Sequence, residues 1–343
     1  MSDTRIAHGG NLHDAARRHG IPYDAWLDLS TGINPVGYPV PPVPADAWRR
    51  LPDDGDGLAA CAADYYGAPD PAHVLPVAGS QAAIRALPAL LPALLPDGDV
   101  GVAPLAYGEY GPAFARRGHR VAPLDIAVDT LPATLRHVIV GNPNNPTAER
   151  VAAERLLGWH AQLAARGGTL IVDEAFADTG AAGSLAACVN RPGLVVLRSV
   201  GKFFGLAGIR AGFVLAHPEL IVSLRDTLGA WTVGGPARHA VAAAFADRAW
   251  QAAARERLAA DGARLAALLR GHGYVVHSTP LFSWTADPHA ADLHAALARH
   301  GIWTRHFAQP SSVRFGLPGN DDEWRRLERA LAQCVPALRA QPR

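Results

Sequence analysis

Residues 194–205 of the chain read Leu-Val-Val-Leu-Arg-Ser-Val-Gly-Lys-Phe-Phe-Gly. The run from Leu194 to Leu197 is short and apolar, as expected of a strand buried on both faces of a sheet. Lys202 is the only lysine in the chain, since the other 31 of its 32 basic residues are arginines. Arginine stays protonated, whereas a desolvated lysine amine can lose its proton and act as a nucleophile. The stretch therefore predicts a buried strand that is followed a few residues later by a lysine kept for its chemistry, the alternative being that one lysine survives by chance.

Similar short apolar runs occur on both sides of this stretch, separated by segments with helical spacing such as residues 152–166. The runs are Val74 to Val77, Val100 to Val102, His137 to Val140, Leu170 to Val172 and Phe213 to Leu215. Strands that alternate with helices in this way are typical of a mostly parallel sheet covered by helices. The sequence therefore predicts an α/β fold.

The pattern changes near Pro236, where a long helix is expected to run towards Arg270. Further strands are expected at 274–277, 282–285 and 312–315, and helices at 290–300 and 321–334. At the other end, a short helix at 12–19 is stopped by Gly20, and apolar residues punctuate the Pro/Gly-rich stretch 32–44. We expect an N-terminal arm (1–45) that joins a smaller C-terminal domain (236–343), and a large domain between them (46–235).

Composition excludes several classes of partner. The 343 residues are 49% hydrophobic, and their charges are interspersed around a net charge of +1, so neither nucleic acid nor a membrane surface is an expected partner. No signal-like or membrane-spanning run is found in the sequence. Cys61, Cys188 and Cys334 lie far apart without metal-ligand spacing, which indicates reduced, mostly buried thiols of a cytoplasmic protein without a metal site.

Polar groups follow the predicted strands. Gly79, Ser80 and Gln81 open a helix directly after one strand, where backbone N–H groups and the helix dipole can hold a phosphate, although Ser80 is equally compatible with a plain N-cap. Tyr107 follows the next strand and is either an aromatic binding face or a core residue. Two Asn-Pro steps fix a rigid loop around Asn145.

Asp173 ends an otherwise apolar strand, where a carboxylate needs a partner. Ser199, Lys202 and Arg210 follow at spacings of three and eight residues. All these groups fall at the carboxyl ends of predicted parallel strands, which is where open α/β sheets bind their ligands. The sequence therefore predicts one ligand site at this edge of the sheet.

In this combination of motifs the chain resembles the fold-type I pyridoxal phosphate enzymes of the aspartate aminotransferase superfamily. The resemblance implies that Lys202 carries the cofactor covalently, that Asp173 pairs with its ring nitrogen, that Asn145 donates to the ring hydroxyl, and that Tyr107 stacks on the ring. It also implies a homodimer with sites at the subunit boundary. The residues implied to bind the cofactor phosphate are Gly79, Ser80, Gln81, Ser199 and Arg210.

The N-terminal motifs at 8–11 (His-Gly-Gly-Asn) and 28–37 (Asp-Leu-Ser-Thr-Gly-Ile-Asn-Pro-Val-Gly) are similar to those of the threonine phosphate decarboxylase family. Phe176 also follows that family, because its relatives, the histidinol phosphate aminotransferases, usually have tyrosine there. The resemblance implies decarboxylation of O-phospho-L-threonine to 1-aminopropan-2-ol phosphate for cobalamin biosynthesis. The implied substrate-binding residues are His8, Gly9, Gly32, Asn145, Arg305 and Arg314, with Arg314 on the α-carboxylate.

Two positions depart from the family pattern. Gly32 stands where asparagine is common, and Leu51 stands where related enzymes have a tyrosine that reaches the neighbouring subunit. Without the resemblance, His8 is an ordinary surface histidine. Two alternatives stay open: an aminotransferase of the histidinol phosphate type, and a catalytically silent fold-type I protein that acts as a partner in corrin amidation. Release of carbon dioxide separates the first from a decarboxylase, and an absorption spectrum separates the second.

Overall fold

A computed structural model describes residues 8–91, 99–180 and 183–339. The chain folds into two compact units. The small unit comprises the described residues of Met1–Val36, Pro146–Ala148 and Ala254–Arg343, and the large unit comprises those of Gly37–Asn145 and Glu149–Ala253. The sequence predicts a large domain over residues 46–235. The observed large unit is longer at both ends, because it starts at Gly37 and ends at Ala253. Its reach is explained by Tyr38, whose ring packs edge-on against Trp250 at 5.2 Å and Phe204 at 6.5 Å.

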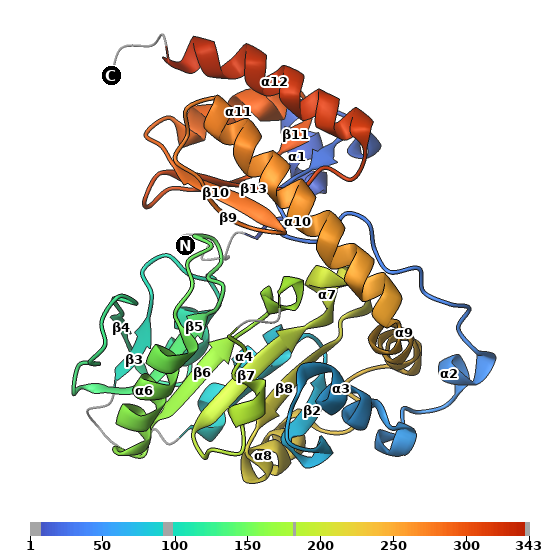
Figure 1. The fold of residues 1–343 in the computed structure, drawn as a ribbon, viewed down its shortest axis with the longest axis vertical. Coiled ribbons are helices and arrows are strands. Elements are labelled where there is room, and N and C mark those ends of the chain that lie inside the picture. The colour runs from blue at the N-terminus through green and yellow to red at the C-terminus, as the bar shows by residue number, and fades with distance from the viewer. Residues whose placement is uncertain (1–7, 92–98, 181–182, 340–343) are drawn as a thin grey trace. The chain divides into compact units, whose positions relative to one another are not determined.

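The large unit is built on a seven-stranded sheet with the order β2-β8-β7-β6-β5-β3-β4 (Figure 1). All six strands predicted for this region form, each within two residues of its expected ends. The strands are β2 (Val74–Val77), β3 (Asp99–Val102), β4 (Arg120–Pro123), β5 (Leu135–Gly141), β6 (Thr169–Asp173), β7 (Leu194–Ser199) and β8 (Gly212–Ala216). The pairs β7·β6, β6·β5, β5·β3 and β3·β4 are parallel, as the apolar runs predict.

Strand β8 is the exception, because it is antiparallel to both β7 and β2. Arg210 therefore precedes an antiparallel strand. The expectation that it lies at the carboxyl end of a parallel strand is wrong. Since β8 runs the other way, its first residues lie at the same sheet edge as the last residues of β2 and β7. The reversal brings Arg210 to the predicted edge.

Strand β4 was not predicted. It lies at the end of the sheet and pairs only with β3 among the described residues, and three of its four residues are exposed. An exposed edge strand has no apolar run to reveal it.

The prediction of mostly buried cysteines is wrong for Cys61, which is exposed. Cys334 is buried as expected, and Cys188 is intermediate.

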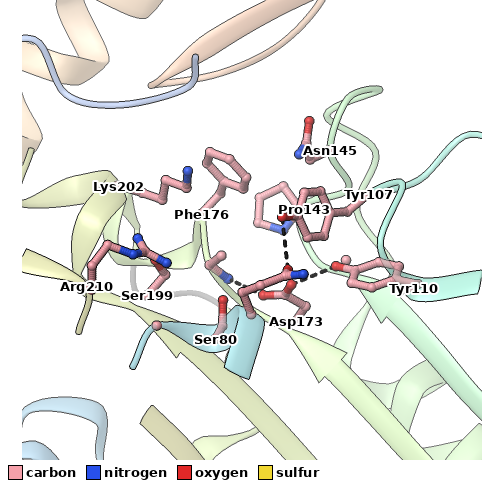
Figure 2. A pocket seen from close by; sticks show the side chains of 14 residues that line it. Ser80, Tyr107, Tyr110, Pro143, Asn145, Asp173, Phe176, Ser199, Lys202 and Arg210 are labelled. Atoms are coloured by element: carbon pink, nitrogen blue, oxygen red, sulfur yellow. Dashed lines mark hydrogen bonds between the residues drawn. The ribbon is translucent and has the colours of Figure 1, made fainter. Parts of the chain in front are cut away.

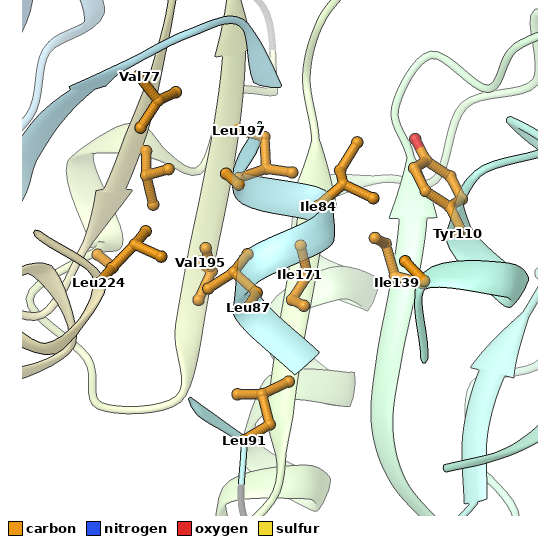
Figure 3. Close-up of a cluster of buried hydrophobic side chains, with 14 of the residues drawn as sticks. Val77, Ile84, Leu87, Leu91, Tyr110, Ile139, Ile171, Val195, Leu197 and Leu224 are labelled. Atoms are coloured by element: carbon orange, nitrogen blue, oxygen red, sulfur yellow. The ribbon is translucent and has the colours of Figure 1, made fainter. Parts of the chain in front are cut away.

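Helices cover both faces of this sheet. On one face, side chains of α4, α5 and α8 interleave with Val77, Ile139, Ile171 and Leu197 in one buried cluster (Figure 3). On the other face, α6 packs against β5 and β6. The helices of the large unit are α2 (Ala45–Arg49), α3 (Leu58–Tyr66), α4 (Ser80–Leu90), α5 (Tyr110–Ala115), α6 (Ala153–Ala164), α7 (Val200–Phe203), α8 (Pro218–Leu228) and α9 (Gly235–Ala246).

The prediction of one long helix from Pro236 towards Arg270 is wrong. The segment forms two helices, α9 and α10 (Arg248–Gly271). Asp247 between them has a non-helical backbone, with φ −84° and ψ 79°. Its Oδ1 accepts a hydrogen bond from the Trp250 N–H at 2.9 Å. An aspartate in this position caps a new helix, which ends the preceding one.

The small unit contains an antiparallel sheet of order β12-β13-β10-β9 and a parallel pair, β1 with β11. The strands are β1 (Leu27–Asp28), β9 (His277–Thr279), β10 (Phe282–Ala286), β11 (Ile302–Trp303), β12 (Arg305–Phe307) and β13 (Ser312–Gly316). The helices are α1 (Leu12–His19), α11 (Ala290–Arg299) and α12 (Asp321–Arg339).

Most predicted elements of the small unit are confirmed. Helix α1 ends where expected, with Gly20 in the left-handed conformation at φ 66°. The strand predicted at 274–277 is displaced, since β9 begins only at His277. Because Leu27 and Asp28 pair with Ile302 and Trp303, the first segment of the chain belongs to this unit. Within the described residues, no helix combines the length and apolar character needed to cross a bilayer.

Candidate active site

A cavity of about 160 Å³ lies in the large unit at the sheet edge predicted from the sequence (Figure 2). All nine residues predicted to contact a cofactor line it: Gly79, Ser80, Gln81, Tyr107, Asn145, Asp173, Ser199, Lys202 and Arg210. Five further residues complete its wall: Tyr110, Gly141, Pro143, Ala175 and Phe176. These side chains come from segments far apart in sequence, and the strand order gathers them at one edge.

One end of the cavity is formed by the start of α4 and by Arg210. Gly79 has φ +75°, and a Cβ there would lie 2.7 Å from the Arg210 Nη2. This backbone conformation, with ψ 156°, is one that glycine adopts far more readily than other residues, and the missing Cβ leaves room for the guanidinium beside the first turn of α4. Ser80 is the first residue of α4 and Gly79 holds the N-cap position, so the alternative of Ser80 as an N-cap does not apply. A helix N-terminus beside a guanidinium forms a binding place for a dianionic phosphate.

The centre of the cavity holds the carboxyl group of Asp173, the last residue of β6. Asp173 is 6% exposed. Its Oδ2 accepts a hydrogen bond from the Tyr110 hydroxyl at 2.7 Å, and its Oδ1 accepts one from the Ala175 N–H at 3.0 Å. Burial raises the pKa of Asp173, while these two donors and the charge of Lys202 oppose the rise. The carboxylate is therefore strongly desolvated and suited to pair with a cationic group.

Two tyrosines flank the cavity. The Tyr107 hydroxyl donates a hydrogen bond to Gln81 Oε1 at 3.0 Å, and its ring meets the Tyr110 ring edge-on at 5.5 Å. Burial raises the pKa of Tyr107 to about 12, so its phenol is protonated at neutral pH. Tyr107 thus presents a neutral aromatic ring, held by its hydrogen bond to Gln81, to the cavity. Figure 2 shows the ring beside Asn145 and Pro143.

Lys202 enters the cavity from α7, the single turn that follows β7. Its Nζ lies 5.6 Å from the centroid of the Phe176 ring. Phe176 comes from the turn after β6, three residues beyond Asp173. The two loops that carry Asp173 and Lys202 therefore converge on one space (Figure 2).

A buried ion cluster links the bases of these two loops, and sequence reasoning did not predict it. Arg198 on β7 donates to Glu174 Oε2 at 2.5 Å and also binds the carboxylate of Asp178. Glu174 accepts a further hydrogen bond from the Ser184 hydroxyl at 2.7 Å. The three charged residues are each at most 5% exposed. Because Glu174 adjoins Asp173 in sequence and Arg198 adjoins Ser199, the cluster holds both loop bases in place.

The predicted substrate-binding residues other than Asn145 belong to the small unit. Arg314 on β13 is opposite Arg305 on β12 in the antiparallel register, so both point to the same face of that sheet. Arg314 is buried, and its Nη2 donates to the Ser30 carbonyl oxygen at 2.6 Å. The Gly10 N–H donates to the Ser30 hydroxyl at 2.7 Å, so the segment at His8 meets Arg314 at Ser30.

Burial disfavours the positive charge of both arginines. Burial lowers the pKa of Arg314 to about 10, and the neighbouring charge of Arg305 contributes to the same direction. Burial also lowers the pKa of Arg305. Two desolvated guanidinium groups on one sheet face are an arrangement that an anionic ligand would stabilise.

The remaining predicted residues are also placed. His8 is exposed and Gly32 is buried, both in the small unit. Leu51 is 65% exposed in the large unit, close in sequence to Trp48, which is 69% exposed. Gly32 has no side chain that could contact a ligand. Leu51 has an apolar side chain without a hydrogen-bonding group.

The chain belongs to the aminotransferase class I and II family, whose model matches residues 55–331. This confirms the predicted fold-type I architecture. The chain is 50% identical over 328 residues to a threonine-phosphate decarboxylase of Pseudomonas aeruginosa, covering 95% of this chain and 97% of that one. It is 42% identical over 337 residues to a threonine-phosphate decarboxylase of a Sinorhizobium species, covering 96% and 98%.

A solved structure has the same fold. The histidinol-phosphate aminotransferase from Sinorhizobium meliloti in complex with pyridoxal-5'-phosphate superposes with a TM-score of 0.79, at 20% identity, covering 98% of this chain and 100% of that one. Identity that low shows the fold alone. The resemblance to the threonine phosphate decarboxylases, first indicated by the N-terminal motifs, is confirmed by the sequence relatives over nearly the whole chain.

Proposed function

We propose that this protein is a pyridoxal 5'-phosphate-dependent decarboxylase that converts O-phospho-L-threonine to 1-aminopropan-2-ol phosphate for cobalamin biosynthesis in the cytoplasm. The observation that carries the proposal is a single cavity that gathers the only lysine of the chain, a buried carboxylate and a phosphate-binding helix start. The name of the relatives at 50% and 42% identity supports the choice of reaction.

The residues of the cavity fit the cofactor group by group. The start of α4 with Arg210 suits its phosphate, Asp173 suits a protonated ring nitrogen, and Lys202 suits its aldehyde. Tyr107 offers a flat face for the ring, and Asn145 an amide for the ring hydroxyl. When bound, pyridoxal phosphate supplies an electron sink for the pair of electrons left on Cα as carbon dioxide departs.

The protein residues would bind, orient and move protons. The Lys202 amine would hold a proton and return it to Cα after carbon dioxide leaves. Asp173 would stay ionised and hold the ring in one position. In this proposal Lys202 and Asp173 are the catalytic residues.

Residues of the small unit are proposed to select the substrate. Arg314 would bind the α-carboxylate through its planar fork, and Arg305 with His8 and the Gly9 backbone would bind the phosphate. Support comes from the desolvation of both arginines, which favours a ligand carrying more than one negative charge. Gly32 would lie along the same ligand without contributing a side-chain donor.

An aminotransferase of the histidinol phosphate type is the second candidate. Phe176 argues against it, because its ring carries no hydroxyl to bond the cofactor oxygen, and that hydroxyl is usual in those relatives. The third candidate, a silent partner protein in corrin amidation, is opposed by the presence of Lys202 and Asp173 in the same cavity.

We also propose a homodimer. Trp231 is 61% exposed and is held at φ 61°, an unfavourable conformation for a bulky residue. Its segment and the η2 turn (Asp54–Asp56), which follows Leu51, line one hollow, and Trp48 precedes that turn on α2. Exposed aromatic and aliphatic side chains of this size are typical of a surface that a second copy covers.

Turnover with O-phosphothreonine tests the proposed function. We expect release of carbon dioxide without any added keto acid, with free threonine a much poorer substrate because Arg305 is left without the phosphate. Lys202→Ala is the inactive control. Keto-acid-dependent consumption of histidinol phosphate, with no carbon dioxide from O-phosphothreonine, would instead establish the aminotransferase.

A further inference from the structure

The hydroxyl of Tyr110 bonds the Asp173 carboxylate directly from a helix distant in sequence. Tyr110 is the first residue of α5, 63 positions before Asp173, and it donates to Asp173 Oδ2 at 2.7 Å (Figure 2). Its side chain is 2% exposed and belongs to the buried cluster between α4, α5 and the sheet. Packing therefore holds the hydroxyl in place and keeps water away from it, so that its hydrogen bond to Asp173 is maintained.

The chemistry of this contact has one direction. The Tyr110 phenol can donate only one proton, and an ionised Asp173 can only accept. Burial raises the pKa of Tyr110 well above its ordinary value, and the negative charge of Asp173 adds to the rise. The phenol is consequently protonated throughout the neutral pH range, which keeps it a donor.

Asp173 needs such a donor because its surroundings oppose its charge. Burial is the largest cause that raises its pKa, and the nearby charge of Glu174 acts in the same direction. Tyr110, the Ala175 N–H and Lys202 oppose these effects. The Ala175 N–H belongs to the same turn as Asp173, and Lys202 is committed to the chemistry at the cavity. Tyr110 is thus a side chain outside the reacting groups that stabilises the ionised form.

We propose that Tyr110 is a positioning residue that keeps Asp173 ionised and oriented, so that the buried carboxylate is ready to pair with a protonated aromatic ring nitrogen. The second half of this statement rests on the proposed function, whereas the first half concerns the protein alone. Tyr107 has a different part, because its hydroxyl bonds Gln81 and not Asp173.

The first test uses the protein without added cofactor. The Asp173 carboxyl carbon, assigned with an Asp173→Asn variant, is titrated by carbon-13 NMR in the wild type, Tyr110→Phe and Tyr107→Phe. Loss of a hydrogen bond to a charged group is expected to raise the pKa of Asp173 by about one to two pH units in Tyr110→Phe. Tyr107→Phe, which removes a hydroxyl from the neighbouring ring 5.5 Å away between centroids, should leave it unchanged.

The second test measures the dissociation constants of pyridoxal 5'-phosphate and of its analogue with CH in place of the ring nitrogen, between about pH 5.5 and 8.5. Affinity for pyridoxal 5'-phosphate falls where Asp173 becomes protonated, so this fall should begin about one pH unit higher in Tyr110→Phe. The analogue has no ring nitrogen, and its profile should be the same in both proteins.

The outcomes are separable. An Asp173 that is already protonated at about pH 7.5 in the wild type, or one whose pKa is the same in Tyr110→Phe, overturns the inference whatever the enzyme does. A wild type that binds neither ligand overturns the proposed function and leaves the NMR result to stand alone. Because the wild-type titration is decisive by itself, the inference stays testable even where Tyr110→Phe folds poorly.

Discussion

Replacing Arg314 by methionine is expected to leave the protein at least as stable as the wild type while it removes turnover. Arg314 is buried, and burial lowers its pKa to about 10, so the charged form is disfavoured in the folded state. At about pH 7–8 the guanidinium is charged in both the folded and the unfolded chain. The full difference, about 3 kcal/mol at roughly 1.4 kcal/mol per pH unit, therefore counts against folding throughout that range.

Part of this gain is offset in the variant. Methionine cannot donate to the Ser30 carbonyl oxygen, which Arg314 Nη2 now bonds at 2.6 Å. A hydrogen bond from a charged group contributes about 1.5–3 kcal/mol, and methionine fills a similar apolar volume. The net expectation for Arg314→Met is a free energy of unfolding equal to the wild type or higher by about 1 kcal/mol.

Arg238 is the matched control for this substitution. It is 5% exposed, like Arg314, but it binds both oxygens of Asp56 at 2.6 and 2.7 Å, and these contacts raise its pKa. Arg238→Met should therefore lower the free energy of unfolding, by about 1–2 kcal/mol. The same chemical change is thus expected to destabilise the protein at Arg238 and not at Arg314.

The assay combines urea unfolding without substrate with steady-state kinetics on O-phosphothreonine. Arg314→Met should lower kcat/KM at least a hundredfold, equivalent to about 2.8 kcal/mol, and Arg314→Lys, which keeps the charge without the planar fork, by about tenfold to a hundredfold. A variant that is clearly destabilised and yet keeps kcat/KM within about tenfold of the wild type would show that Arg314 serves the fold and not the substrate.

Three further expectations can be checked directly. The purified protein should show a visible absorption band that borohydride bleaches, and mass spectrometry should then find the cofactor on the peptide carrying Lys202; an unmodified peptide contradicts the assignment. The double change Leu51→Asp and Trp231→Asp should turn a dimer into a monomer in dilute sedimentation, whereas Val275→Asp, at a residue 75% exposed in the small unit, should not. Burial lowers the pKa of His294 to about 4, so the unfolded chain takes up a proton at this residue before the folded chain does as the pH falls below 6.5. The free energy of unfolding of the wild type should therefore drop by about 2 kcal/mol from this residue between pH 7.5 and pH 5. In His294→Gln the drop over the same range should be smaller by about 2 kcal/mol.

Sequence alone was enough for the class of fold and for most of the cavity. Runs such as Leu194 to Leu197 are apolar because their strands are covered on both faces, and burial on both faces is a property that composition records directly. The left-handed Gly20 at the end of α1 is equally local, since its conformation depends on its own missing Cβ. Lys202 could be selected because it is the only lysine of the chain, and Asp173 because a carboxylate at the end of an apolar strand needs a partner.

Tertiary structure decided what depends on partners distant in sequence. An apolar run does not encode its direction, so the reversal of β8, which brings Arg210 to the site edge, appears only in the pairing with β7 and β2. The exposed edge strand β4 left no hydrophobic signal. Tyr110 reads in sequence as one more core aromatic, and its hydrogen bond to Asp173 exists only because α5 and β6 are packed together across 63 residues of chain. Side-chain hydrogen bonds are set by geometry over a few ångströms, and the fold alone supplies that geometry.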